Sequence, residues 1–399
     1  MASNKSFLNQ IKEWRHYLHA HAETAFEEKA TSEYVANILT KLGLNVFRRI
    51  GGTGVVAVLK IGEGKEVIGL RSDMDAINMI EVGNYPYRSI NTGKMHACGH
   101  DGHMATLLGT AKLLSERRNF NGTVVFIFQP AEEPGKGAMA MIADGLLERF
   151  PMDEIYGLHN VPQLPEGTIH TRVGGIMASE DNFVISIKGK GTHASSPHIG
   201  VDPLVIASEI ILSLQTIVSR RVNPLTPAVI SCTQIYTDGA HNAIPTNVKI
   251  MGDTRSYTPE LQELFEKQMK SISEGICKMH GAVCKFEYTH EFTPTSNWEK
   301  CVKVAVEAAK AVVGEDNVNS NCEPLMVSED FGAFTKRIPG CFVFLGSRKF
   351  KKPTIPLHNS TYDYNDDILE SGAEFFAELI RNRLSYNYVD LSLSADVKR

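Results

Sequence analysis

Residues 104–128, MATLLGTAKLLSERRNFNGTVVFIF, join a helical pattern directly to a strand pattern. Within Met104–Arg118 the apolar side chains recur at helical spacing and form one stripe along a helix. The run Val124–Phe128 is short and wholly apolar, which is typical of a strand buried on both faces of a sheet. A helix followed by such a strand predicts an α/β domain whose sheet is covered by helices on both sides.

The same two patterns recur on either side of this stretch. A helical pattern covers Asn9–Leu42 and ends before Gly43. Further short apolar runs bounded by Gly, Asp or Pro occupy Val55–Lys60, Val67–Arg71, Glu154–Leu158 and Cys341–Leu345. Segments from both ends of the chain are therefore expected to build one main sheet.

The middle of the chain follows a different order of elements. The predicted strands and helices are, in chain order, strand Asn182–Gly189, helix Asp202–Arg221, strands Ala228–Tyr236 and Asn247–Asp253, helix Pro259–His280 and strand Ala282–Thr289. This βαββαβ order is that of the ferredoxin-like split unit, which closes on itself as a small domain. We therefore expect a discontinuous main domain, residues 1–177 and 293–399, interrupted by an inserted domain at 178–292.

The composition excludes several classes of protein. With 43% hydrophobic and 22% charged residues, the chain of 399 residues is typical of a globular protein rather than a disordered, collagen-like or coiled-coil one. Lys and Arg number 41 and Asp and Glu 46, so the net charge is −5. Since no basic block is present to neutralise phosphates, nucleic acid is not an expected partner.

The chain carries no clear signal for secretion or for a membrane. No stretch approaches the roughly 20 uncharged apolar residues of a membrane-spanning helix, and the first residues lack the apolar centre of a signal peptide. The seven cysteines are scattered without CxxC spacing and are expected to be reduced thiols. We therefore expect a cytoplasmic protein with no membrane partner.

Three of the fourteen histidines fall within residues 96–103, HACGHDGH. Gly99 and Gly102 disfavour a helix there, so a loop that enters the following helix is expected. Such a loop can direct the Cys98 sulfur and the His100 imidazole toward one point, as a transition metal requires. An isolated Cys-Gly-His is more often a buried thiol beside a polar helix cap, so this segment alone does not establish a metal site.

Other candidate ligands follow the ends of predicted strands. One strand runs into Glu132 and Glu133, the next runs into His159, and a loop after the last strand reaches His358. Open α/β sheets place their sites beyond the carboxyl ends of the strands. Singly, a solvated carboxylate pair and a packed core imidazole are the more common structures. Jointly, the convergence of these residues on one edge of the sheet predicts a metal site.

Adjacent carboxylates in an extended or turning backbone point in different directions. Glu132 and Glu133 are therefore expected to differ in role, one binding metal and the other acting as a general base. Asp73, Asp75 and Asp101 are candidates for orienting the ligand imidazoles by hydrogen bonds, with turn formation an equally good interpretation of each.

Five motifs of the chain closely resemble those of the aminoacylase and hippurate hydrolase family of dinuclear metallopeptidases. They are RSDMDA (71–76), HACGHDGH (96–103), QPAEE (129–133), SEDFG (328–332) and LHNS (357–360). The resemblance spans about residues 10–385 and implies a zinc-peptidase-like α/β sandwich as the catalytic domain. It also implies two divalent metal ions per subunit, Zn, Mn, Co or Ni, with Glu132 as the general base. The implied ligands, among which Cys98 is expected to bridge the ions, are Cys98, His100, Glu133, His159 and His358.

The resemblance further implies that the inserted domain is a lid and dimerisation domain. His193 would reach into the site of the partner subunit to stabilise the oxyanion, while Asn242 and Arg255 would hold the substrate carboxylate, a task that suits the bidentate geometry of Arg. A homodimer is expected, with a tetramer left open. The sequence lacks two prolines of the family pattern, having Ala22 and Asn78 instead, and the second lies near the expected substrate mouth.

The expected activity is hydrolysis of the amide bond of an N-acyl-L-amino acid, hippurate-like or N-acetylated, to a carboxylate and an amino acid. Glu132 would accept a proton from water and return it to the departing amine. An N-acetyl-diaminopimelate deacetylase or a dipeptidase of the same superfamily is the nearest alternative.

Two alternatives come from other classes of protein. A thiol amidase would use Cys98 as a nucleophile activated by His100 or His159, and EDTA would leave it active. A non-catalytic metal-binding protein is the other alternative. The presence of Glu132 beside Glu133 argues against it, since a storage site has no use for a base that binds no metal.

Overall fold

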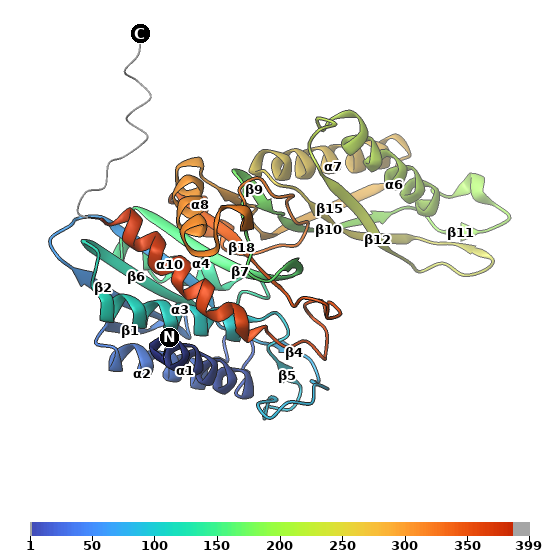
Figure 1. Cartoon of the computed structure of the whole chain (residues 1–399). Helices are drawn as coiled ribbons and strands as arrows, with labels where there is room; N and C mark the ends of the chain where they lie inside the picture. Colours follow the sequence, from blue (N-terminus) through green and yellow to red (C-terminus); the bar gives the residue numbers. More distant parts are fainter. Residues whose placement is uncertain (1, 386–399) are drawn as a thin grey trace, which may run out of the picture. The chain divides into compact units, whose positions relative to one another are not determined.

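The computed structural model of the chain describes residues 2–385 (Figure 1). The chain divides into two compact units. Unit 1 comprises Met1–Ile176, Ser296–Glu323 and Asp330–Arg399, and unit 2 comprises Met177–Thr295 and Pro324–Glu329. Residues 386–399 of the predicted main domain lie outside the described residues. The domain boundaries given above, and the role of the inserted part as a lid, remain predictions.

Unit 1 contains an eight-stranded sheet in the order β1-β2-β6-β3-β7-β18-β8-β17. These strands are β1 (Asn45–Ile50), β2 (Gly54–Ile61), β3 (Val67–Asp73), β6 (Gly122–Gln129), β7 (Glu154–Pro165), β8 (Ile169–His170), β17 (Val318–Asn319) and β18 (Gly340–Arg348). The neighbours β6, β3, β7 and β18 run parallel, whereas β2 pairs antiparallel with β6 and β1 pairs antiparallel with β2. The α/β prediction is confirmed, and the five predicted main-sheet strands all occur in this one mixed sheet.

The helices of unit 1 pack on the sheet or on one another. They are α1 (Ala2–Ala20), α2 (Lys29–Lys41), α3 (His100–Arg117), α4 (Gly137–Ala143), α5 (Leu146–Arg149), α8 (Glu299–Val313), α9 (Gly332–Thr335) and α10 (Leu369–Arg383). Helix α3 contacts α1, α2 and α10 as well as β3, β6 and β7. Its residues from His100 to Ala111 are all buried, so this helix forms the centre of the unit.

The predicted single helical pattern over Asn9–Leu42 is wrong, because the structure breaks it between α1 and α2. Phe26 has a positive φ of 61°, which a continuous right-handed helix does not contain. The carboxylate of Glu23 accepts hydrogen bonds from the backbone N–H groups of Ala30 and Thr31, at 3.2 and 2.8 Å. These are donors in the first turn of α2 that have no partner within the helix, so Glu23 stabilises a new helix start.

Unit 2 has its elements in the predicted βαββαβ order. They are β10 (Glu180–Lys188), α6 (Pro203–Arg220), β12 (Val229–Thr237), β14 (Asn247–Arg255), α7 (Pro259–Met279) and β15 (Val283–Phe292). The four strands form an antiparallel sheet in the order β12-β14-β10-β15. A separate two-stranded ribbon pairs β11 (Thr192–His193) with β13 (Ala243–Ile244). Figure 1 labels β11, which is drawn in light green.

Helix α6 is the one helix of the described residues that is long and apolar enough, by length and composition alone, to cross a membrane. Its inner face packs in the core of unit 2 through Ile206, Ile210 and Leu214, all of which are buried. Because it also carries the charged Glu209, we interpret α6 as an amphipathic helix that packs in a domain core.

Short elements complete the chain. Unit 1 also has the hairpin of β4 (Ile77–Asn78) with β5 (Lys94–Met95), and β9 (Gly174–Met177) and β16 (Thr295–Asn297) lie where the chain passes between the units. The 3₁₀ turns are η1 (Pro197–Ile199), η2 (Glu315–Asn317) and η3 (Asp366–Ile368).

Candidate metal centre

Four segments of unit 1 bring the predicted ligands together. The loop between β5 and α3 carries Cys98, and His100 is the first residue of α3. The loop after β6 carries Glu133, β7 carries His159, and the segment after β18 carries His358. Glu133 and His358 follow the carboxyl ends of β6 and β18, as expected for an open α/β sheet. His159 lies within β7, just after the residues that pair with β3, and Cys98 and His100 follow the antiparallel β4–β5 hairpin.

The potential ligand atoms of these side chains form two overlapping groups. Within each group the atoms lie within 4.8 Å of one another: Cys98, His100 and His159 in the first, and Cys98, Glu133 and His358 in the second. The Cys98 Sγ is 3.5 Å from His159 Nε2, and His358 Nε2 is 3.4 Å from Glu133 Oε1. Cys98 therefore belongs to both groups.

Two of the imidazoles are oriented as metal ligands usually are. His100 Nδ1 donates to the main-chain carbonyl of Asp75, and His159 Nδ1 donates to that of Asn160, both at 2.8 Å. A carbonyl can only accept, so each ring, when neutral, carries its hydrogen on Nδ1 and keeps the Nε2 lone pair. Although burial opposes it, the nearby Asp73 carboxylate raises the pKa of His100, so a metal ion there would displace a proton. The His100 Nε2 atom is buried and has no hydrogen-bond partner among the described residues. Together with the thiol and carboxylate, this donor set fits transition metal ions such as zinc.

The loop that holds the two adjacent glutamates is fixed by buried carboxylates. Asp75 Oδ1 accepts the backbone N–H of Glu132, and its Oδ2 accepts that of Glu133, each at 3.0 Å. Ala131 takes a positive φ of 50°, and its N–H donates to Glu28 Oε1 at 2.9 Å. Asp75 therefore positions the site twice, through its carbonyl at His100 and through its carboxylate at this loop.

The two other aspartates predicted to orient the ligand rings make different contacts. Asp73 accepts from His103 Nδ1 at 2.7 Å and from Arg71 at 2.9 Å, and lies 3.8 Å from His100 Nε2. Asp101 accepts from Arg15 at 2.7 Å. The orienting hydrogen bonds to the His100 and His159 rings come instead from main-chain oxygens.

The electrostatics of the site disfavour a thiol nucleophile. Desolvation, together with the nearby Glu133 carboxylate, raises the pKa of the Cys98 thiol to about 12. A nucleophilic cysteine needs the opposite shift, toward a lowered pKa. Burial also lowers the pKa of His159, which keeps that imidazole neutral and able to act as a ligand. All seven cysteines are free thiols.

Sequence reasoning missed a buried network beneath the glutamate loop. Asp330 accepts from Gln129 Nε2 at 2.7 Å, from Arg71 at 3.0 Å and from the backbone N–H of Ala138 at 2.9 Å. The signal available in the sequence was Arg71 itself, a charged residue in an otherwise apolar strand, because a buried charge requires a partner. The first histidine of the motif, His96, is not among the clustered ligands, and burial lowers its pKa to about 3.

The three predicted substrate-binding residues belong to unit 2. His193 is exposed on β11, and its Nδ1 lies 2.7 Å from Ser195 Oγ. Asn242 is next to it, since the Asn242 carbonyl accepts from the N–H of Ala194 at 2.9 Å. Arg255 ends β14, where it pairs with Glu180 at 2.8 Å and Asp253 at 2.7 Å. The structure thus brings His193 and Asn242 together, while Arg255 already has carboxylate partners.

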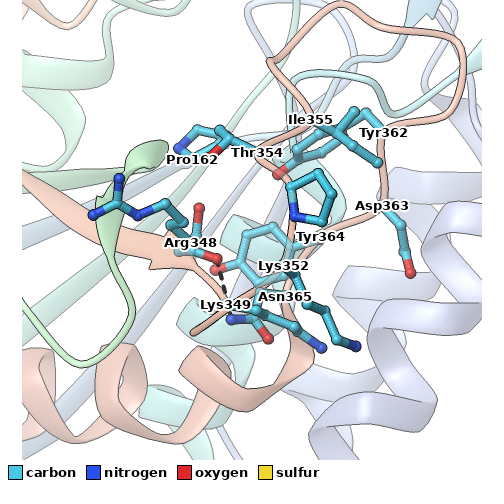
Figure 2. Close-up of a pocket in the computed structure, with 12 residues that line it drawn as sticks. Pro162, Arg348, Lys349, Lys352, Thr354, Ile355, Tyr362, Asp363, Tyr364 and Asn365 are labelled. Atoms are coloured by element: carbon cyan, nitrogen blue, oxygen red, sulfur yellow. Dashed lines mark hydrogen bonds between the residues drawn. The ribbon is translucent and has the colours of Figure 1, made fainter.

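A pocket of about 260 Å³ lies in unit 1 near the segment that carries His358 (Figure 2). Its cations are Arg348, Lys349 and Lys352, and Asp363 lies at its margin in the view drawn. None of the five clustered ligands lines this pocket. It is therefore a feature of the same unit that is separate from the ligand cluster.

Comparisons with known proteins agree with this geometry. A family model described as peptidase family M20/M25/M40 matches residues 69–382. Hippurate hydrolase of Campylobacter jejuni is 40% identical to the chain, over 93% of the chain and 95% of that protein. N-acetylcysteine deacetylase of Bacillus subtilis is 36% identical, over 94% and 97%. The crystal structure of the Bacillus subtilis YXEP protein, a dinuclear metal binding peptidase from the M20 family, is 33% identical with a TM-score of 0.83, covering 95% of this chain and 99% of its own.

Proposed function

The chain belongs to peptidase family M20/M25/M40 and is a hydrolase of amide bonds, and from this premise we propose that its substrates are N-acyl-L-amino acids, which it cleaves to a carboxylate and a free amino acid. The observation that carries the proposal is the pair of ligand groups that share Cys98. Hippurate-like and N-acetylated amino acids are the proposed substrate classes, because the most similar relatives reported above are named for such compounds.

The proposal includes two divalent metal ions per subunit. Cys98, His100 and His159 would hold one ion, and Cys98, Glu133 and His358 the other, with the Cys98 sulfur as the bridge. The support is that each group supplies three ligand atoms within 4.8 Å of one another. When bound, such ions lower the pKa of water from about 15.7 toward 7 and polarise a carbonyl oxygen. The mixed sulfur, nitrogen and oxygen donors suit Zn, Mn, Co or Ni.

Glu132 is the proposed general base. Asp75 holds the main chain of both glutamates, so their side chains leave adjacent positions of a fixed loop in different directions. Glu133 falls in the group with Cys98 and His358, whereas Glu132 lies with His100 and Glu133 in a further group, beside the proposed ions. We assign Glu132 to accept a proton from the attacking water. The same carboxyl then gives that proton to the departing amine.

The proposed assembly is a homodimer formed through unit 2, with a tetramer as the alternative. On α6, Val205 and Leu212 are 60% and 72% exposed, although both are apolar. The edge strand β12 exposes Ile235 and Tyr236 in the same unit. Exposed apolar surface of this kind is typical of a protein interface. We also propose a cytoplasmic location, which the seven free thiols support.

The test is a panel of amides assayed with metal-free protein that is reconstituted one ion at a time. We expect no turnover without metal, and release of amino acid from hippurate or N-acetyl-amino acids after addition of Zn, Mn, Co or Ni. Dipeptides and N-acetyl-diaminopimelate belong in the panel, because preference for either would favour the corresponding alternative. Undiminished hydrolysis by fully metal-free protein would contradict the proposal and support a thiol enzyme.

A further inference from the structure

The buried guanidinium of Arg15 donates hydrogen bonds to three carboxylates, one of which directly follows the proposed ligand His100 in the chain. Arg15 on α1 is completely buried, and its Nε donates to Asp101 Oδ2 at 2.7 Å. A terminal nitrogen donates to Asp366 Oδ1 at 3.3 Å, and the other terminal nitrogen donates to Asp363. The face of the guanidinium lies 4.8 Å from the centre of the Tyr87 ring, whose hydroxyl donates to Asp363 at 2.9 Å. All three nitrogens of the Arg15 guanidinium therefore donate to carboxylates.

The three carboxylates lie on two segments of the chain, one that carries the proposed ligand His100 and one that carries the proposed ligand His358. Asp101 directly follows His100 in the first turn of α3. Asp363 follows His358 on the segment that leads into η3, where Figure 2 shows it beside Tyr362 and Tyr364, and Asp366 is the first residue of η3. His100 and His358 fall in different ligand groups, so Arg15 joins a segment of one group to a segment of the other.

Two imidazoles of α1 also contact these carboxylates, and one of them, His16, lies with its Nε2 2.8 Å from Asp366 Oδ2. His19, also on α1, contacts Asp101 Oδ2 through Nδ1 at 2.7 Å and Glu81 Oε1 through Nε2 at 3.0 Å. It therefore shares its charge with a further carboxylate. Without the guanidinium, the buried Asp101 would lose its partner and would repel Asp363, whose side chain is partly exposed. The segments of His100 and His358 would then move apart.

We infer that Arg15 is a positioning residue that sets the distance between the two proposed metal positions by holding Asp101 and Asp363 on one guanidinium. The inference rests on the proposed function, because it assumes that both groups bind metal. Arg15 touches none of the proposed ligands and acts only through the segments that carry them. Lysine at this position would keep the charge but could not serve three carboxylates with the same geometry.

Cobalt binding to the metal-free full chain tests this inference. The variants are Arg15→Lys and Asp363→Asn, with Arg117→Met as the matched control. Arg117 stands near the other end of α3 and forms a similar forked pair with Glu374, at 2.7 and 2.5 Å, on the surface. Equilibrium dialysis counts the bound Co²⁺ ions, and the thiolate-to-cobalt absorption reports coordination by Cys98. Circular dichroism verifies that each variant is folded.

We expect the unmodified chain and the Arg117→Met variant each to bind two Co²⁺ ions, and the affinities of the two proteins to be equal. Arg15→Lys should bind Co²⁺ at least tenfold more weakly, and kcat should recover as the metal concentration rises. Asp363→Asn keeps the hydrogen bond from Arg15 to Asp101. In this variant we expect a lower affinity for only one of the two Co²⁺ ions. If Arg15→Lys does not fold, Asp363→Asn decides the matter alone.

The outcomes separate the two hypotheses. Cobalt affinity and kcat equal to those of the unmodified chain in both folded variants would overturn the positioning role and leave the proposed function intact. An unmodified chain that binds no cobalt would instead overturn the proposed function, and the inference with it. A lowered melting temperature with unchanged cobalt affinity would show that the network only stabilises the fold.

Discussion

At the scale of single residues, the candidate site combines side chains that the sequence reveals with acceptors that it does not. Cys98, His100 and Glu133 could be nominated because a thiol, imidazoles and carboxylates were predicted to converge on one edge of the sheet, although each alone has a more common structural use. The oxygens that orient His100 and His159 are main-chain carbonyls of Asp75 and Asn160. Every residue has such a carbonyl, so no residue type marks them in a sequence. For this reason the clustering of these side chains was predictable and the hydrogen bonds that orient them were not.

The division of labour between the two glutamates can be tested by paired substitutions. Glu132→Gln should keep both metal ions but lose turnover by about 10²- to 10⁴-fold, because the amide cannot accept the proton of water. Glu133→Gln, with nearly the same change in structure, should lose metal, because a neutral amide is a poorer ligand. Metal analysis and steady-state kinetics on the two proteins check both statements. Near-normal activity of Glu132→Gln would assign the base to another residue.

At the scale of elements, the sequence predicts periodic segments well and breaks between them poorly. The apolar run Val124–Phe128 became the centre of β6, because a strand buried on both faces leaves a continuous apolar signature. The break between α1 and α2 was missed, since Glu23 stabilises the new helix start from outside the helical pattern. Helix α3 begins at His100, earlier than the apolar stripe suggested, with Gly99 at a φ of 92° before its first turn. Here tertiary burial outweighs the low helix propensity of glycine.

Gly102 in this helix should be intolerant of any side chain. A Cβ there would lie 2.2 to 2.4 Å from ring atoms of Tyr364, whose side chain is buried and cannot move aside cheaply. We expect Gly102→Ala to destabilise unit 1 by about 1–3 kcal/mol through overpacking. Gly275→Ala in α7 is the matched control, because nothing lies within 4 Å of its Cβ position.

Since alanine favours a helix more than glycine does, the control should be neutral or stabilising by up to about 1 kcal/mol. Calorimetry of the two variants measures both effects. A Gly102→Ala protein as stable as the unmodified chain would mean that Tyr364 does not pack against α3 in this way.

At the scale of the whole molecule, the positions of the three proposed substrate-binding residues in unit 2 suggest which subunit of a dimer would supply each of them. His193 and Asn242 lie in the β11–β13 ribbon, before the start of β14, whereas Arg255 is the last residue of that strand. At about 3.3 Å per residue, the length of β14 is roughly 26 Å. Asn242 precedes the first residue of β14 and Arg255 is its last residue. We therefore propose that the partner subunit supplies Asn242, together with His193, to the site that Arg255 serves.

Mixed assemblies of two inactive variants test whether these residues serve different subunits. We expect His193→Ala and Arg255→Ala to be nearly inactive when pure. If His193 serves the partner's site, a hybrid dimer contains one site with both residues intact. Random pairing makes half of the dimers hybrid, so co-refolded chains should regain about a quarter of the full activity.

The interface itself supplies the control for this experiment. Leu212→Glu, placed in both chains, puts a charge on the exposed apolar face of α6 and should prevent the recovery if that face joins the subunits. Sedimentation measures the assembly, and hydrolysis of a substrate identified in the panel measures recovery. If hybrid dimers form but activity is not recovered, each chain completes its own site. His193 would then not contact the substrate bound by the partner subunit.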